Sequence, residues 1–376
     1  MGTLTQASHQ WATRPRDERF LDLNELQNRV GHVKENSLAK VVSSRKLRFQ
    51  PSEADPRRGL EVIHEDDGIA TPTHFSFGQL ASLAKAPAGY LRTLPAPIAA
   101  DNLNYGMRFA REAENVGVLL TSSEFAGEGG LPALKSDELR AATGPNYGRI
   151  WNADIVAALR EKFGDGRTGD FRVPGEFGKQ VEITRDNTTI YGSDRDMFVF
   201  LADETNRIEV PNRRDGKPGS LAKGFFVWNS EVGSSTMGAA FFLFDYACSN
   251  RTVWGAQGFQ EIRLRHTANA PDRWLEEIAP VLLAYSKASA GPVEETIKAA
   301  QAKKMDDDLD DFLKARFTAP QAASIKQAHV REEGRPIETL WDVTTAITAH
   351  AKSIVWQDER VALERQAGKV LDLVAA

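Results

Sequence analysis

Residues 224–246 read GFFVWNSEVGSSTMGAAFFLFDY, and they carry the clearest structural signal in the sequence. Successive side chains of a β-strand point to opposite faces of a sheet, yet both faces are apolar here: Phe225 and Val227 alternate with Phe226 and Trp228. The run AAFFLF has the same property. Strands that are apolar on both faces lie inside a sheet that helices cover. We therefore predict two central strands joined by the polar turn NSEVGSS.

Further strands flank this pair. The sequence between residues 181 and 266 contains several short apolar runs separated by turn-forming residues. The segment RRDGKPGSLAKG, residues 213–224, has the composition of an exposed hairpin tip. The predicted strands are Val181–Thr184, Met197–Ala202, Phe225–Ser230, Ala239–Tyr246 and Glu261–Arg265.

Helical periodicity prevails elsewhere. From Phe75 to Arg108, apolar residues recur at helical spacing between prolines, which indicates short helices joined by tight turns. Another helix is predicted from its cap Asn152 to Phe163, where two glycines end it. The segment 125–132 is rich in glycine but lacks the Lys-Ser/Thr of a phosphate loop, so we predict a mobile loop. After Pro271 the pattern is helical.

These patterns predict an α+β protein with a central, largely antiparallel sheet, a helical and irregular N-terminal part and a helical C-terminal tail. We expect a polar arm at residues 1–74, with one short strand at Leu60–Ile63. An α+β core follows at residues 75–270, in which Val116–Leu120 forms a strand, and a helical region occupies residues 271–376.

The composition excludes several classes of protein. Of 376 residues, 41% are hydrophobic and 26% charged, which does not fit disordered, collagenous or coiled-coil chains. With one cysteine, Cys248, the chain forms neither an intramolecular disulfide nor a cysteine-based zinc site. No apolar run approaches the ~18–20 residues of a membrane span, and the first residues lack the apolar block of a signal peptide. We expect a cytoplasmic protein without a membrane partner.

The net charge of −5 is distributed unevenly. Residues 205–270 carry 8 basic and 5 acidic side chains, so this middle region has a local charge of +3. An excess this small neither requires nor excludes nucleic-acid binding, because domains that depend on phosphate contacts often have a pI above about 9.

An acidic run, Asp306–Asp311, has carboxylates that could bind a hard cation. It lacks the glycine and the alternating spacing of a calcium loop. Acids in the first turn of a helix, with Lys314 and Arg316 at its far end, account for the run better. We predict no metal site and no cofactor.

A basic strand end offers another candidate. His266 follows a strand in which Arg263 and Arg265 share a face, and such a group can hold an anion such as a phosphate. Alternatively, these side chains pair with neighbouring acids, Glu261, Asp272 or Asp245, and lock the sheet to the next helix.

The turn Asn229–Ser235 has the densest polar sequence. Ser230 could be a nucleophile and Glu231 a base, but the Gly-x-Ser-x-Gly pattern of hydrolases is missing. A polar turn between core strands is the alternative. Cys248 has no lysine, arginine or histidine within two residues, which predicts a buried, unreactive thiol. We therefore assign no catalytic residue.

Aromatic rings beside cations are typical of surfaces that bind single-stranded nucleic acid. Tyr147, Arg149 and Trp151 stand at alternate positions in GPNYGRIWN. Two further pairs, Trp228 with Lys223 and Trp254 with Arg251, fit the same description. Packing in the core accounts for any one of these groups equally well.

Several segments together resemble a family of phage/plasmid-like proteins, described as a domain of unknown function (932). The most specific are GFFVWNSEVGSSTMG from Gly224, FDYACSNRTVWG from Phe244 and RLRHT from Arg263. Others are FSFGQLASLAKAPAGYLRTLP, NYGRIWNADIV, DRDMFVFL and LWDVTTAITAHAK, so the resemblance covers most of residues 70–375. The family favours glycine after Cys-x-Asn, where this chain has Arg251.

The resemblance implies cargo of phages, plasmids or other mobile elements. A central sheet followed by helices is also similar, at the level of the fold, to single-strand annealing recombination proteins, which form rings on exposed DNA. We therefore expect a non-enzymatic protein that binds single-stranded DNA and promotes annealing as a homo-oligomer. The candidate binding residues are Lys223, Arg263, Arg265, His266, Arg149, Arg251, Tyr147 and Trp151.

Two alternatives stay open. The protein could be an enzyme acting on nucleic acid or a phosphorylated small molecule, with Glu231 or Asp245 as base and His266 as acid or anion partner. It could also be a structural or host-interaction protein whose basic side chains are all paired with acids.

Overall fold

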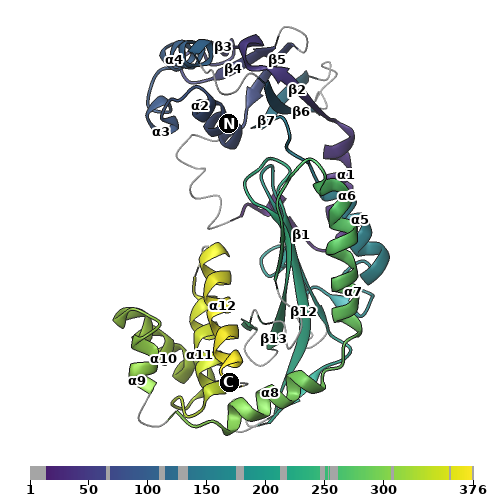
Figure 1. Cartoon of the computed structure of the whole chain (residues 1–376), viewed down its shortest axis with the longest axis vertical. Coiled ribbons are helices and arrows are strands. Elements are labelled where there is room, and N and C mark those ends of the chain that lie inside the picture. Colours follow the sequence, from purple (N-terminus) through teal and green to yellow (C-terminus); the bar gives the residue numbers. More distant parts are fainter. Residues whose placement is uncertain are drawn as a thin grey trace.

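The computed structural model describes residues 14–64, 68–109, 115–125, 134–174, 182–211, 218–245, 250–252, 254, 261–305, 309–354 and 357–374. These residues form two β-sheets, A and B, surrounded by helices (Figure 1). From β1 onward, the described chain passes from sheet A through all of sheet B, returns to sheet A and continues into a helical tail.

Sheet A is antiparallel at every described pairing, with the order β1-β9-β10-β12-β13-β14. Three short strands add to it, because β8 pairs with β10, β11 with β12 and β15 with β13. The strands are β1 (Arg19–Phe20), β8 (Phe171–Arg172), β9 (Ile190–Gly192), β10 (Met197–Asp203), β11 (Ile208–Val210), β12 (Gly219–Asn229), β13 (Met237–Asp245), β14 (Asn250–Thr252) and β15 (Ile262–Leu264).

Helices cover both faces of sheet A, which is why its central strands are apolar throughout. Side chains of one face, such as Val199, Phe225 and Phe241, belong to a core with helices α1 (Leu23–Glu35), α5 (Asn152–Phe163), α6 (Ala270–Glu277) and α7 (Ala279–Lys287). On the other face, Phe200 and Phe242 pack with Val361 of α12 (Gln357–Asp372).

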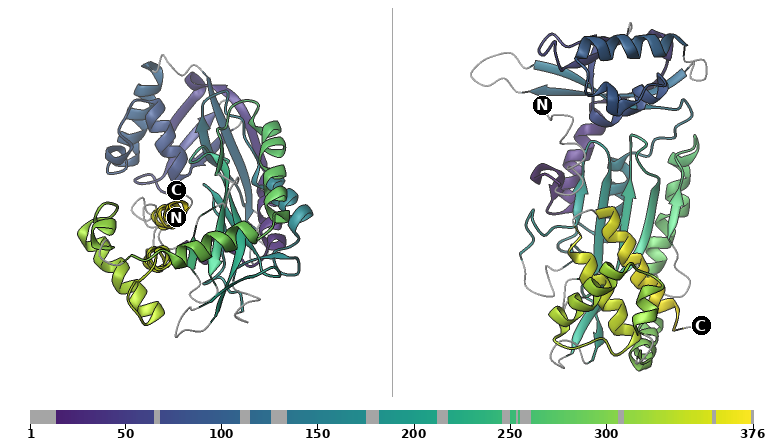
Figure 2. Two further views of the ribbon diagram at one scale, coloured as in Figure 1. Left: turned by 60° about the horizontal axis from the view of Figure 1, so that its bottom comes forward. Right: turned by 90° about the vertical axis from the view of Figure 1, so that its left-hand side faces the viewer.

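Sheet B forms a separate layer above sheet A, as the right-hand view of Figure 2 shows. Its order is β2-β6-β7-β5-β4-β3, and within the described strands only β5 and β7 run parallel. Its strands and helices are β2 (Ser37–Ser43), β3 (Leu47–Pro51), β4 (Leu60–His64), β5 (Gly68–Pro72), β6 (Asn115–Phe125), β7 (Leu134–Thr143), α2 (His74–Leu83), α3 (Ala88–Leu91) and α4 (Ala96–Phe109). A core that includes Phe77, Leu103 and Val116 joins these helices to the sheet.

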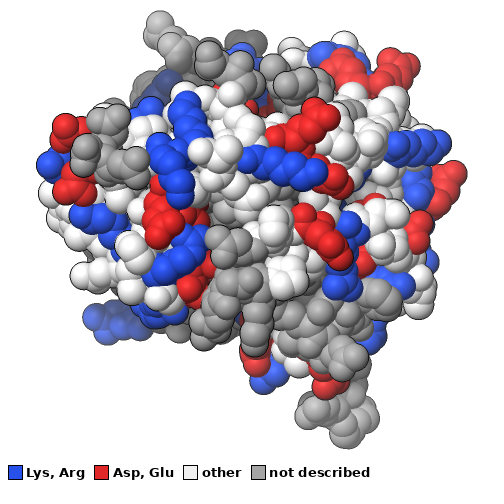
Figure 3. All heavy atoms as spheres, turned by 90° about the horizontal axis from the view of Figure 1, so that it is seen from below, with Lys and Arg blue, Asp and Glu red and all other residues white. Residues whose placement is uncertain are grey.

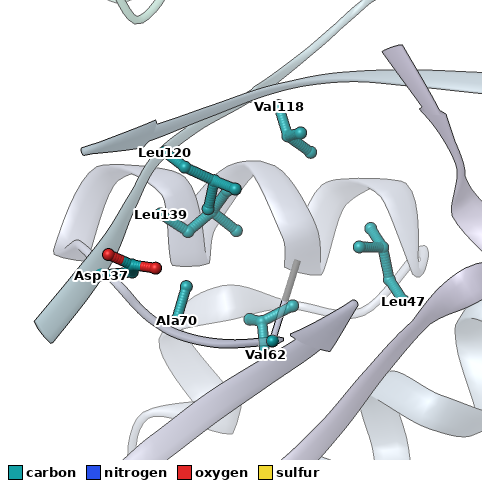
Figure 4. A pocket seen from close by; sticks show the side chains of 8 residues that line it. Leu47, Val62, Ala70, Val118, Leu120, Asp137 and Leu139 are labelled. Atoms are coloured by element: carbon teal, nitrogen blue, oxygen red, sulfur yellow. The ribbon is translucent and has the colours of Figure 1, made fainter. Parts of the chain in front are cut away.

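A cavity of about 20 Å³ lies in the sheet B layer (Figure 4). Asp137 brings a carboxylate to an otherwise apolar lining, and that carboxylate accepts a hydrogen bond from Ser122. One water needs ~10–15 Å³, so the cavity has room for a water and not for a substrate.

The tail consists of α8 (Gly291–Ala302), α9 (Leu309–Lys314), α10 (Ala319–Glu333), α11 (Leu340–Lys352) and α12. Asp310 and Asp311 lie in the first turn of α9 and Lys314 in its last, as the helix-dipole interpretation predicts. The rest of the predicted acidic run, 306–308, lies outside the described residues. Among the helices that the structure describes, none has both the length and the apolar character to cross a membrane.

The α+β class, the antiparallel central sheet and the helical tail are confirmed. The two central strands are β12 and β13, and their side chains are buried on both faces as predicted. The strands 197–202 and 261–265, the strand 116–120 and the short helices of 75–108 are also present, with shifted ends. The glycine-rich segment 126–132 and Cys248 lie outside the described residues.

Three local predictions are wrong. Residues 182–184 form no strand, because Asn187 accepts from the Thr184 amide at 2.7 Å and donates to the Glu182 carbonyl, which holds a turn. Residues 219–224 are no hairpin tip, since they form the start of β12 and pair with β11 and β13. The predicted N-terminal arm has more than the strand at Leu60: it supplies β1, α1 and β2 to β5.

Phe242 tests the two-sided core of sheet A. Its side chain is fully buried and lies 6.0 Å from the Phe200 ring, so Phe242→Ala should lower the free energy of unfolding by about 3–5 kcal/mol. Phe109→Ala is the control, because that ring is 64% exposed, and it should change stability by less than ~0.5 kcal/mol. Urea unfolding measures both; equal effects would contradict this packing.

Candidate nucleic-acid interface

One row of residues crosses sheet A near the end where β12 meets its turn. In the strand register, Tyr191 of β9 faces Phe198 of β10, which faces Trp228 of β12. Trp228 in turn faces Gly238 of β13, and Arg263 of β15 ends the row. Residues directly opposite each other point to the same face, so the row places aromatic rings beside a cation.

Two arginines lie over the Trp228 ring. The guanidinium carbon of Arg263 is 5.8 Å from the ring centroid, and that of Arg365 on α12 is 6.0 Å away. Glu261 joins them, because its carboxylate accepts from Arg365 Nε at 2.7 Å and also from Arg263. Gly238 leaves room for the indole, since a Cβ there would overlap Trp228 Cζ2. The ring and the shared carboxylate together fix both guanidinium groups.

Arg263 and Arg265, and not the ring, face solvent, whereas Arg365 is half-buried. Trp228 is 6% exposed, whereas the Arg263 side chain is 58% exposed and Arg265 is also exposed. Arg263 and Arg365 thus share the single negative charge of Glu261, and the exposed Arg265 follows two residues after Arg263 in the chain. A surface of this kind presents ordered guanidinium groups and a net positive charge to an anion. We call these four residues the arginine cluster.

The opposite end of the row is neutral. Arg14 lies over the rings of Tyr191 and Phe198, at 5.3 and 5.4 Å, but it is buried and forms a salt bridge with Asp196 at 2.6 Å. Its charge is therefore compensated inside the protein.

Next to the row, the turn after β12 contains a buried ion pair. Glu231 is 2% exposed, and its carboxylate accepts from Arg140 of β7 at 3.0 Å and from the backbone amide of Asn152 at 2.9 Å. The second bond places a negative charge at the N-terminus of α5, where the helix dipole favours it. Glu231 therefore connects sheet A, sheet B and α5, and both of its oxygens are occupied.

The rest of the turn is also held by hydrogen bonds. The side-chain amide nitrogen of Asn229, Nδ2, donates to the Ile150 carbonyl and to Asn152 Oδ1, both at 2.8 Å. Ser230 Oγ donates to the Arg195 carbonyl at 2.8 Å, so it is not presented as a nucleophile. The polar-turn interpretation accounts for these contacts fully.

Four of the predicted binding residues meet beside this turn. Arg149 lies 5.4 Å from the Tyr147 ring and 5.9 Å from the Trp151 ring, and it donates to the Glu231 carbonyl. Tyr147 stacks on His266 with ring centroids 4.7 Å apart. The predicted aromatic–cation group therefore exists, but all four side chains are half-buried and pack beside the turn after β12.

Backbone contacts fix the position of His266. The Gly148 amide donates to the His266 carbonyl at 3.1 Å, and His266 Nδ1 donates to the Gly148 carbonyl at 3.0 Å, which defines the neutral tautomer. Burial lowers the pKa of His266, an effect that the nearby Arg149 reinforces. Only glycine fits at position 148, because a Cβ would overlap the Thr267 carbonyl oxygen.

Two predicted residues lie elsewhere. Lys223 is 3% exposed, and its ammonium donates to the carbonyls of Tyr285 and Ala288 at the end of α7, so it stabilises a helix C-terminus. Arg251 lies in β14 opposite Phe244, six residues along β13 from the row, or roughly 20 Å. Its side chain lies outside the described residues.

The predicted catalytic group does not assemble around Asp245. Asp245 pairs with Leu221 at one end of β12, whereas Glu231 follows Asn229 at the other, and eight residues of strand span roughly 26 Å. Proton transfer needs ~3 Å, so Asp245 cannot act with Glu231 or His266 on one substrate. Within the part of the chain that the structure describes, no group of acids, histidines and cysteines is arranged to hold a metal ion.

Three important arginines were not predicted. Arg365 reaches Trp228 from a helix more than one hundred residues later, and Arg140 and Arg14 reach their carboxylates from other elements. Nothing in the local sequence around them indicates these partners.

The end of the molecule seen from below in Figure 3 carries charged residues of both signs, side by side. Among the coloured residues of this view there is no extended basic patch.

Close to Arg14, Glu18 has an unusual environment. It belongs to the short 3-10 helix η1 (Arg16–Glu18), and its carboxylate lies 4.0 Å from Arg14. Burial raises the pKa of Glu18 to about 7; Arg14 lowers it, while Asp194 and Asp196 add to the increase. Glu18 is therefore about half protonated near neutral pH.

Comparison with known proteins identifies one family. The sequence pattern of a domain of unknown function (DUF932) matches residues 181–369, which is half of the chain and includes the turn after β12, the arginine cluster and most of the tail. No curated protein and no solved structure matches the chain.

The Glu231–Arg140 pair should be essential for stability. Glu231→Ala leaves the buried Arg140 guanidinium without its carboxylate and the backbone amide of Asn152 without its acceptor. The free energy of unfolding should therefore fall by about 3–5 kcal/mol. The double variant Glu231→Ala/Arg140→Met should recover part of this loss in urea unfolding, since no charge is then stranded. A single variant as stable as the wild type would contradict the pair.

Glu18 should make the protein less stable as pH rises. Its pKa is about 7 in the folded state against 4.5 as the ordinary value, so the folded protein binds more protons between these pH values and stability falls as pH increases through this window. Glu18→Gln should remove a change of about 3 kcal/mol between pH 4.5 and 8. Urea unfolding across this range measures it; parallel pH profiles for both proteins would refute the assignment.

Proposed function

The chain belongs to the family described as a domain of unknown function (DUF932), and since that description assigns no activity, we propose a function from the chain's own geometry: it binds single-stranded DNA on the arginine cluster. The observation that supports this proposal is the stacking of Arg263 and Arg365 on one tryptophan, with the exposed Arg265 two residues after Arg263 in the chain.

Order in the cluster favours binding. A long arginine side chain normally loses much rotamer freedom when it contacts a ligand. Here the Trp228 ring and Glu261 already restrict Arg263 and Arg365, so less entropy is lost when a phosphate arrives. Guanidinium groups pair with phosphate oxygens through two parallel bonds and also stack on bases, and single strands offer both.

The same geometry favours a role in binding DNA over a role in catalysing a reaction on it. Among the described residues no group of acids, histidines and cysteines is arranged to hold a metal ion, and the Glu261 carboxylate in the cluster is already bonded to two arginines. Annealing requires only that the backbone is held while the bases stay free to pair. In more detail, we propose that the protein belongs to a phage or plasmid, acts in the cytoplasm and anneals DNA strands as a homo-oligomer.

Removing two charges tests the proposal. Arg263→Ala/Arg265→Ala should weaken binding of a fluorescent oligonucleotide of any sequence and reduce the slope of log K against log salt by about 1.4, because each phosphate contact on a single strand contributes ~0.7. Fluorescence anisotropy between low and moderate salt measures both quantities. No binding of the wild type at micromolar concentration in ~50 mM salt would overturn the proposal, since phosphate-driven affinity is strongest there.

Three further variants separate this mechanism from a general loss of charge. Arg316→Ala is the matched control, because Arg316 is an exposed arginine stacked at 3.8 Å on Phe312 in the tail, and its loss should leave DNA affinity unchanged. Trp228→Leu keeps every charge but removes the ring under the arginines, so it should weaken binding. Glu261→Gln keeps an acceptor oxygen that can still order the arginines but removes the negative charge that competes with a phosphate, so it should strengthen binding. Thermal unfolding confirms that each variant is folded.

A further inference from the structure

A second basic surface lies at the β1 edge of sheet A, away from the arginine cluster. A cleft of about 630 Å³ opens there, lined by Arg16, Asp17, Phe20, Glu25, Arg29 and Arg185. Clefts of ~300–1,000 Å³ are the size that small ligands occupy. The six residues come from η1, β1, α1 and the turn after residue 182, so folding brings them together.

Arg185 is committed to the structure. Its guanidinium donates to the backbone carbonyls of Arg16 and Arg19 and to the Glu25 carboxylate. Glu25 also accepts from the Leu21 amide at 2.8 Å. Arg185 therefore neutralises Glu25 and closes one wall of the cleft.

The other two arginines keep their donors available. Arg29 lies one helical turn after Glu25 on α1, but that carboxylate is taken by Arg185. Among the described residues, neither Arg29 nor Arg16 has a carboxylate within 4.0 Å, although Glu138 is near enough to Arg29 to feel its charge. Both side chains are exposed, and Asp17 is the one lining carboxylate that Arg185 does not bind. The cleft thus has two open guanidinium groups against one acid.

We propose that this cleft binds a phosphate-bearing ligand, with the phosphate between Arg16 and Arg29. Guanidinium groups from two elements can each donate two parallel bonds to a phosphate, which a carboxylate or a neutral ligand would satisfy less well. The phosphate has two possible sources, a free nucleotide or the backbone of a nucleic-acid strand, and both present the same oxygens to the cleft.

Inorganic pyrophosphate is the first probe, measured by isothermal titration calorimetry on the full chain. Wild-type protein should bind it with a dissociation constant below about 1 mM. Arg16→Gln/Arg29→Gln should weaken binding at least tenfold, whereas Arg316→Gln/Arg331→Gln removes the same charge from exposed positions of the tail and should have no effect. Absence of saturable binding to the wild type, or equal loss in both double variants, would overturn the proposal.

Two more ligands distinguish the sources. If thymidine monophosphate needs Arg16 and Arg29 while an oligonucleotide binds the variant normally, the cleft serves a free nucleotide. If the oligonucleotide also loses affinity, the cleft extends the path of the strand. Either result supports the phosphate site, and the Arg263→Ala/Arg265→Ala variant, which leaves this cleft intact, should bind pyrophosphate like the wild type.

Discussion

The Glu231 carboxylate is the contact on which the arrangement of the two sheets depends. It lies in the turn between the two central strands of sheet A, yet one of its oxygens bonds to Arg140 of sheet B and the other to the first amide of α5. A charge buried this deeply is costly unless it is paired and hydrogen-bonded, so the three elements must arrive in the relative orientation that gives each carboxylate oxygen its partner. The Gln79 side chain adds a neutral link, because it donates to the Val232 carbonyl and accepts from the Ala142 amide.

The polar turn and the basic surface are therefore separate parts of one end of sheet A. The turn uses its hydrogen bonds within the protein itself, and the half-buried Tyr147, Arg149 and His266 belong with it. In the arginine cluster, Arg263 lies over the Trp228 ring and its side chain is 58% exposed to solvent. Similar residue types thus have opposite uses, and burial is what distinguishes them.

The sequence was sufficient to predict the fold class and the central strands, because two-sided apolar runs such as FFVW are typical of strands inside a covered sheet. It was also sufficient to place Tyr147, Arg149 and Trp151 together, since their spacing is local. It could not predict that Lys223 is buried, because a lysine in a strand reveals nothing of the helix end that receives it. Contacts such as Arg365 with Trp228 depend on how a distant helix packs, and no local pattern encodes that.

The strand β1 has a consequence for the order of folding. It pairs with β9, and the Thr188 hydroxyl donates to the Phe20 carbonyl across 168 residues, with all of sheet B between them in the chain. Closing so long a loop costs entropy that only a formed partner surface can offset. Sheet B, whose strands are contiguous in sequence, can therefore assemble early during synthesis, while the N-terminal segment waits for β9 to emerge. Arg19 and Phe20 of β1 would then be among the last described residues to reach their native positions.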